Sequence, residues 1–186
     1  KFLSEMEGGM VPVDLWKHEE TGTTDQGSKE LEELLGGKYF DFPKPYSLIK
    51  RIFSIITDNQ NDGIFLDYFS GSAPSAQAVL ELNKEDGGNR RFLCVQLPEE
   101  TDEKSEAFKA GYKTIADIAK ERIRRVIKKI ENEQETEKKE KAGKLDFGDE
   151  KEVPKLDLGF KVFKLQSSNF KIWRGNKFEN GEQLEK

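Results

Sequence analysis

The sequence has few of the residues on which redox and metal chemistry depend. Its 186 residues include one cysteine, Cys94, and one histidine, His18. One cysteine excludes an intrachain disulfide, and the place of Cys94 inside the apolar run RFLCVQL predicts a packed thiol in an intracellular protein. His18 lies among charged residues with no cysteine or second histidine nearby, so we expect no metal site.

Long apolar runs and net positive charge are also missing. No run can cross a bilayer, and the N-terminal KFLSEMEGG has no apolar region of the signal-peptide type, so we expect no membrane contact. The net charge is -5 and the pI about 5.2, which argues against strong non-specific DNA binding by this chain alone. Lys1 and its surroundings read as mid-sequence, so we expect a piece of a longer protein.

The middle of the chain has a strand, helix, strand pattern. GIFLDYF, at 63–69, is a continuous apolar run of strand length, as in a strand buried on both faces, and RFLCVQL, at 91–97, is a second. Between them, SAQAVLELNKEDG has helical apolar spacing and ends at Gly87. Such a crossover predicts adjacent parallel strands covered by helices, and therefore an α/β fold.

The flanking regions divide by composition. Residues 1–40 are expected to be an irregular lead-in with at most a short helix at 28–35, and a helix is expected after Pro45. A long amphipathic helix is predicted from Ile115, and its ERIRRVIKK face is expected to be solvated, with a phosphate contact as the alternative. Residues 132–155 are rich in charge, and their first part loses the apolar stripe, which predicts either a frayed helical extension or a flexible linker. In 156–186, LGFKVFKL and SNFKIW predict a C-terminal strand region that completes the sheet.

The segment DYFSGSAPSAQAV places a Gly/Ser loop between a buried strand and a helix. A glycine in such a turn lets a ligand approach the backbone, and the following helix start offers unpaired amides. The segment lacks both the Lys-Ser/Thr pair of a P-loop and the three glycines of a dinucleotide site. The pattern therefore indicates a nucleotide or carboxylate site, with a purely structural tight turn as the alternative.

Asp67, Phe69 and Gly71 resemble the S-adenosylmethionine loop of amino-methylating DNA methyltransferases, an acidic residue, any residue, Phe, any residue, Gly. FDFPKPYSLIKRI, NKEDGGNRRFLCVQLPEE, AGYKTIADIAKERIRRVI and LGFKVFKLQSSNFKIW are similar to the modification subunits of Type III restriction systems. The resemblance covers nearly the whole chain. It implies the C-terminal part of a beta-class methyltransferase, with a partial doubly wound, Rossmann-like sheet and a cofactor-binding core at 41–131.

The resemblance also implies which residues bind S-adenosylmethionine. The loop would surround the methionine end of the cofactor, an upstream loop would line the same pocket, and a neutral residue stands where an acidic one usually binds the ribose. The implied residues are, in that order, Asp67, Phe69, Ser70, Gly71 and Ser72; Phe42, Lys44 and Pro45; and Gln96, with Glu99 three residues on. Ala73 replaces a glycine frequent in the wider superfamily, which puts the fine geometry of the loop in question.

The tetrapeptide of the Asp-Pro-Pro-Tyr type, which holds the target amine in this family, does not occur in the sequence. In the beta order it precedes the part seen here, so the resemblance implies a truncated chain with no catalytic residue of its own and no activity alone. The whole bacterial, cytoplasmic protein would methylate adenine in double-stranded DNA as a homodimer and recruit a restriction and helicase subunit. The residues do not decide between adenine and cytosine.

Two other classes of function are weighed against this one. A non-catalytic scaffold that only makes subunit contacts stays open, and cofactor binding discriminates between the two. A nucleotide-dependent oxidoreductase is disfavoured because the glycine pattern is wrong.

Overall fold

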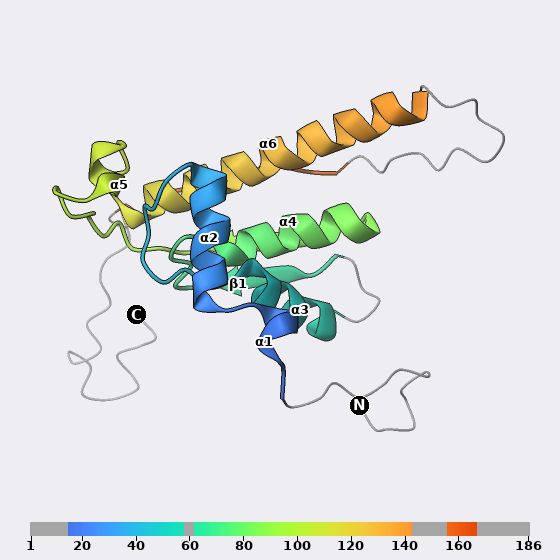
Figure 1. The fold of residues 1–186 in the computed structure, drawn as a ribbon, viewed down its shortest axis with the longest axis horizontal. Helices are drawn as coiled ribbons and strands as arrows, with labels where there is room; N and C mark the ends of the chain where they lie inside the picture. The colour runs from blue at the N-terminus through green and yellow to red at the C-terminus, as the bar shows by residue number, and fades with distance from the viewer. Residues whose placement is uncertain (1–14, 58–61, 143–155, 167–186) are drawn as a thin grey trace, which may run out of the picture.

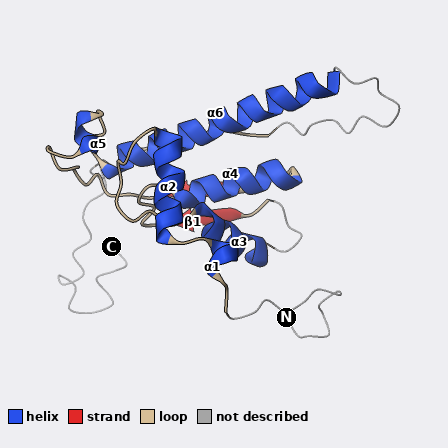
Figure 2. Cartoon of the chain, in the orientation of Figure 1, coloured by secondary structure: helices blue, strands red, loops and turns tan. Residues whose placement is uncertain are grey.

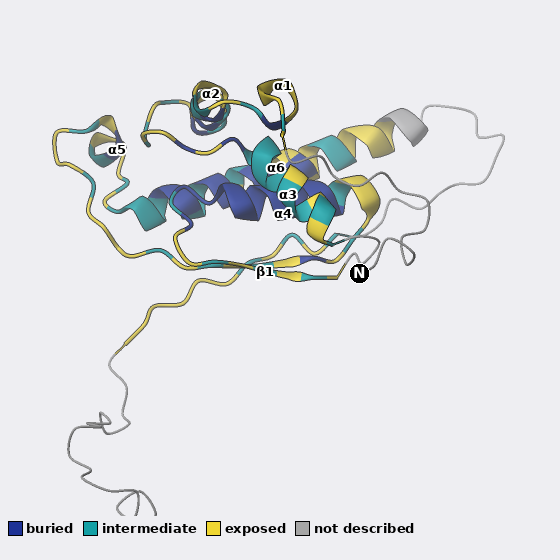
Figure 3. Ribbon diagram, turned by 90° about the horizontal axis from the view of Figure 1, so that it is seen from below, coloured by how far each residue is buried: buried dark blue, intermediate teal, exposed yellow. Residues whose placement is uncertain are grey.

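The computed structural model describes residues 15–57, 62–142 and 156–166. Within them, helices form a layer on one face of a small two-stranded sheet (Figures 2 and 3). The elements in chain order are α1 (His18–Thr21), α2 (Thr24–Leu35), α3 (Tyr46–Ile56), β1 (Ile64–Asp67), α4 (Pro74–Asp86), β2 (Arg91–Cys94), α5 (Glu106–Lys109) and α6 (Ile115–Ala142).

The expected strand, helix, strand unit is confirmed. β1 and β2 pair in parallel, with Ile64 opposite Arg91 and Asp67 opposite Cys94, and α4 connects them. Each strand has four residues, fewer than the apolar runs that predicted it. The pairing continues beyond the strands, because the Val95 amide donates to the Asp67 carbonyl at 2.8 Å. The fold is thus mixed helix and strand with a parallel pair at its centre.

The expectation that both faces of these strands are buried is wrong for the described residues. Alternate side chains of the sheet face solvent and are between 40% and 63% exposed: Ile64, Leu66, Tyr68, Leu93, Val95 and Leu97. The helices cover only the opposite face (Figure 3). The physical reason is that a continuous apolar run shows only that both faces of the strand are apolar enough to be buried. It does not indicate whether this chain supplies the cover.

α2 begins earlier than the sequence predicted. The Thr23 hydroxyl caps it by accepting a hydrogen bond from the Gln26 amide at 3.2 Å. Gly27 is buried inside the helix, where a β-carbon would lie 2.6 Å from the carbonyl oxygen of Pro43. This glycine therefore serves a close approach between helix and loop, and the lead-in at 1–40 is partly helical.

α6 forms the long outer helix of the structure (Figure 1). Its apolar positions, with those of α4, make the main core cluster of Ala73, Ala76, Leu80, Ala119, Ile123, Val126 and Ile130. The helix continues through Ala142, so residues 132–142 are the helical extension and not a linker, and 143–155 lie outside the described residues. None of the described helices is long and apolar enough to cross a membrane.

The strand expected at LGFKVFKL is absent from the described residues 156–166. Leu156, Leu158 and Phe160 pack against the main core cluster through their side chains, and the Arg124 guanidinium lies 6.0 Å from the centre of the Phe160 ring. Every second side chain of this segment, namely Leu156, Leu158 and Phe160, thus faces the main core cluster. Val162 and Phe163, which the strand prediction used, are 54% and 84% exposed. SNFKIW lies outside the described residues.

The turn between α4 and β2 is closed by a buried side chain. Asn83 is 5% exposed, and its amide donates to the Arg90 carbonyl at 2.8 Å and accepts from the Arg90 backbone amide at 3.0 Å. The Arg90 guanidinium returns to Asp86 at 2.7 Å, and this contact lowers the pKa of the Asp86 carboxyl. Together these contacts set where β2 starts relative to α4.

We predict that Asn83→Ala lowers the free energy of unfolding by about 2 to 4 kcal/mol, because a buried backbone donor and acceptor each lose their partner. Urea unfolding followed by circular dichroism measures the change. Asn132→Ala, an exposed asparagine of α6, is the control and should stay within about 0.5 kcal/mol of the parent. Equal effects of the two substitutions would contradict the account of the turn.

Candidate functional site

The loop that follows β1 turns sharply at the carboxyl end of the strand. The Ser70 amide donates to the Val95 carbonyl at 3.1 Å, and the Ala73 amide donates to the Ser70 carbonyl at 2.6 Å. Gly71 and Ala73 both have left-handed backbone, with φ of 51° and 59°. α4 then starts with Pro74, and no side chain caps it at Ala73. The loop therefore presents backbone at the edge of the sheet.

Ala73 takes this left-handed conformation without being glycine. Such a conformation costs roughly 1–2 kcal/mol for a residue with a β-carbon. The side chain is fully buried in the main core cluster, and that burial offsets part of the strain. The replacement of glycine by alanine, which the sequence left in question, is therefore compatible with the turn.

Gly71 lies between an aromatic ring and an amide side chain. A β-carbon at Gly71 would lie 3.3 Å from Cζ of Phe40. Its backbone N–H donates to Oε1 of Gln96 at 2.8 Å. Gln96 was expected to face the ribose, and the structure places its carbonyl oxygen on the loop itself. Sequence reasoning missed Phe40, which stands two residues before Phe42 in the segment FDFPKP.

Asp67 holds the loop to the start of α4. Its Oδ1 accepts from the Phe69 amide at 3.2 Å, and its Oδ2 accepts from the Ser75 hydroxyl at 2.6 Å. The Ser75 hydroxyl also lies 3.7 Å from the Cys94 sulfur. Burial raises the pKa of the Cys94 thiol to about 11, so the thiol stays protonated at neutral pH. Asp67 thus stabilises the loop, with each of its carboxylate oxygens accepting a hydrogen bond.

The loop serines point inward. Ser70 and Ser72 are 4% and 2% exposed. The Ser72 hydroxyl accepts a hydrogen bond from Nη1 of Arg122 in α6 at 3.1 Å. The Ser70 hydroxyl is buried and has no hydrogen-bond partner among the described residues. One buried polar atom in the loop is therefore left available for a ligand or water.

The upstream loop at 42–45 has both buried and exposed residues. Pro45 is buried, and its backbone nitrogen is one of the atoms that approach Gly27 of α2. Phe42 is 77% exposed, with a left-handed φ of 52°, and Lys44 is also exposed. The structure therefore brings Phe40, and not these residues, against Gly71.

The remaining expected residues lie at the surface of the loop region. Phe69 is 85% exposed. Glu99 is exposed too, and its backbone carbonyl accepts from the Ile115 amide at 2.9 Å, which anchors the start of α6. Exposed aromatic rings at Phe42 and Phe69 and bare backbone at Gly71 suit binding. Each oxygen of the Asp67 carboxylate already accepts one hydrogen bond from within the chain.

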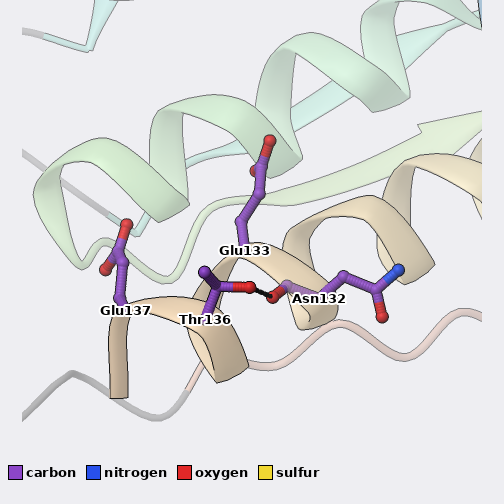
Figure 4. Close-up of a pocket in the computed structure, with 4 residues that line it drawn as sticks. All are labelled: Asn132, Glu133, Thr136 and Glu137. Atoms are coloured by element: carbon purple, nitrogen blue, oxygen red, sulfur yellow. Dashed lines mark hydrogen bonds between the residues drawn. The ribbon is translucent and has the colours of Figure 1, made fainter. Parts of the chain in front are cut away.

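A surface hollow at the far end of α4 is a separate feature. It is lined by Asn132, Glu133, Thr136 and Glu137 of α6 (Figure 4). Glu133 accepts from Nζ of Lys84 at 2.7 Å, which places the hollow beside the last turn of α4. The loop stands at the first turn, ~20 Å away by the rise of an α-helix. The hollow is therefore not part of the loop site.

Comparison with known proteins identifies relatives that are much longer than this chain, and the chain matches only part of each. No family model matches the chain. The Type III restriction-modification enzyme StyLTI Mod subunit of Salmonella typhimurium is 40% identical over 122 residues, which are 66% of this chain and 18% of that protein. The Type III restriction-modification enzyme EcoPI Mod subunit of Escherichia phage P1 is 40% identical over 118 residues, 63% of this chain and 18% of that protein.

A more distant relative belongs to another restriction type. The Type II methyltransferase M.KpnI of Klebsiella pneumoniae is 31% identical over 100 residues, which are 54% of this chain and 24% of that protein. In each of these three comparisons the chain spans a quarter or less of its relative. The chain is thus homologous to part of the Type III restriction-modification Mod subunits, and it is also similar to part of a Type II methyltransferase.

Proposed function

We propose that this chain supplies the S-adenosylmethionine-binding part of a site-specific DNA adenine methyltransferase of a Type III restriction-modification system. The observation that carries the proposal is the loop between β1 and α4. Its left-handed Gly71 lies at the carboxyl ends of two parallel strands, where open α/β sheets bind their ligands. The binding core is proposed to be 41–131, with 132–155 as a charged connection and 156–186 as a C-terminal region.

The residues present fit the cofactor. The unpartnered Ser70 hydroxyl offers a hydrogen bond to a carboxylate, and the bare backbone of Gly71 allows close approach. Phe42 and Phe69 offer exposed rings to the cofactor. When bound, S-adenosylmethionine supplies the methyl group. The residues of this chain bind it and orient it.

Gln96 limits the expected affinity. One lone pair of its Oε1 is already used by the Gly71 amide. The Nε2 group is then the part of Gln96 most available to a ribose hydroxyl, and a neutral amide binds a hydroxyl more weakly than a carboxylate does. We therefore expect weak binding by this chain.

The exposed apolar face of the sheet supports a fold that continues beyond this chain. Six apolar side chains of β1, β2 and the residues after them face solvent. Parallel sheets are normally covered on both faces. We propose that other parts of the whole protein add strands and helices here to complete a doubly wound, Rossmann-like sheet, and that the Asp-Pro-Pro-Tyr type loop lies among them.

In the whole protein the reaction would be direct transfer to the exocyclic amine of adenine in double-stranded DNA. Positioning and exclusion of water would lower the barrier, with no covalent enzyme intermediate. The whole protein is proposed to act as a homodimer and to bind a restriction and helicase subunit. The names of the Type III relatives, which describe Mod subunits of restriction-modification enzymes, support a restriction subunit as partner.

A non-catalytic scaffold is the second candidate. It is favoured by one observation, namely that the loop satisfies much of its own hydrogen bonding. Both oxygens of Asp67 and one lone pair of Gln96 are engaged within the chain. A loop that is closed in this way could serve only to join the strands to α4.

We predict that the chain binds S-adenosylmethionine with weak affinity and that Gly71→Val abolishes the binding. A valine side chain would occupy the space for the ligand and collide with Phe40. Gly111→Val is the matched control, because Gly111 has a φ of 95° but no atom within 4 Å of its added β-carbon. Calorimetric titration measures both.

Two results of this titration would count against the proposal. Equal affinities of the folded Gly71→Val and Gly111→Val proteins would place the ligand elsewhere. No heat from the parent at millimolar ligand would favour the scaffold.

We also predict that this chain alone transfers no methyl group to DNA, because it contains no loop to hold the target base. Incubation with radiolabelled S-adenosylmethionine and duplex DNA measures the transfer. Incorporation above background that disappears in Asp67→Asn would show that the catalytic groups lie within the chain.

A further inference from the structure

Arg122 is a charged residue buried without a paired charge. It is 0% exposed, although it lies in the ERIRRVIKK segment that the sequence placed on a solvated face. Its Nε donates to Oε1 of Gln77 in α4 at 2.8 Å, and its Nη1 donates to the hydroxyl of Ser72 at 3.1 Å. Its Nη2 is buried and has no hydrogen-bond partner among the described residues.

Stability alone gives little reason for an arginine at this position. Both of its partners are neutral, and burial lowers the pKa of the guanidinium to about 10. Glu30 of α2 is the carboxylate whose charge most favours the ionised form, yet no ion pair joins the two side chains in the described structure. Buried charges replaced by apolar side chains of similar volume often leave a protein as stable or more so.

The partner of Arg122 in the loop is the residue that lies between the two positions with left-handed backbone. Ser72 stands between Gly71 and Ala73, which both have left-handed backbone. On the other side, Gln96 accepts from the Gly71 amide. Two side chains distant in sequence therefore hold the loop. Arg122 of α6 binds Ser72, and Gln96, which follows β2, binds the Gly71 amide.

We propose that Arg122 is a positioning residue for the loop, which by its hydrogen bond to Ser72 holds Gly71 in the conformation open to S-adenosylmethionine. The proposal rests on the function proposed for this loop. Gln77 fixes the guanidinium in turn, because a second hydrogen bond from Nε leaves Nη1 aimed at Ser72. Arg122 touches no ligand in this account and acts through the loop.

The test compares local opening of the loop with global stability. Arg122→Met keeps much of the length and removes the hydrogen bonds, and Ser72→Ala removes only the acceptor. Both should raise hydrogen exchange at the Gly71 and Ala73 amides about tenfold relative to the Leu93 amide, which lies in the middle of the paired strands, and both should weaken S-adenosylmethionine binding about tenfold. Adding Ser72→Ala to Arg122→Met should change neither quantity further, and Arg122→Lys should restore part of both.

Asn83→Ala is the matched control, since it removes a buried polar contact at the opposite end of α4. It should raise exchange evenly through the core and leave the ratio of Gly71 to Leu93 unchanged. If Arg122→Met and Ser72→Ala behave in the same even way, Arg122 only stabilises the fold and the proposal is overturned. The exchange measurement needs no ligand, so it decides the role of Arg122 in holding the loop even if the parent fails to bind S-adenosylmethionine.

Discussion

Burial of α4 on all sides is the constraint on which the rest of the structure depends. Its first ten residues, 74–83, are all buried, between α3, α6 and the two strands. Several of them are polar, so each needs a partner that the surrounding elements must supply. Gln77 accepts a hydrogen bond from Arg122, and Asn83 donates to the backbone carbonyl of Arg90. Burial also raises the pKa of the Glu81 carboxyl. The positions of α6 and β2 follow from these contacts as much as from apolar packing.

The sequence predicted the elements whose signals are local. α3, α4, α6 and the paired strands each show their own period or apolar run, and the structure has all of them. The prediction failed where a residue serves a distant neighbour. The segment that contains Gly27 was predicted to be irregular, and the approach of Gly27 to Pro43 is visible only in three dimensions. The open face of β1 and β2 was missed for the same reason, because apolar content does not say what covers it.

The candidate site shows the same division between local and distant information. The sequence indicated the Gly/Ser loop between strand and helix, and the structure has that turn, with Gly71 in the left-handed region. It gave no sign of Phe40 against Gly71, or of Gln96 turned onto the loop. Arg122 could not be found at all, since arginines are rarely buried and its neighbours in sequence are charged.

The direction of the helices has an electrostatic consequence for this acidic chain. Gln77 and Lys84 of α4 meet Arg122 and Glu133 of α6 in the same order, so the two helices run side by side in the same direction (Figure 1). Their peptide dipoles then add, and the positive ends of both lie toward the end of the molecule that carries the loop. In a chain with a net charge of -5, the helix dipoles thus contribute partial positive charge at this end that arises from backbone orientation and does not depend on exposed lysine or arginine.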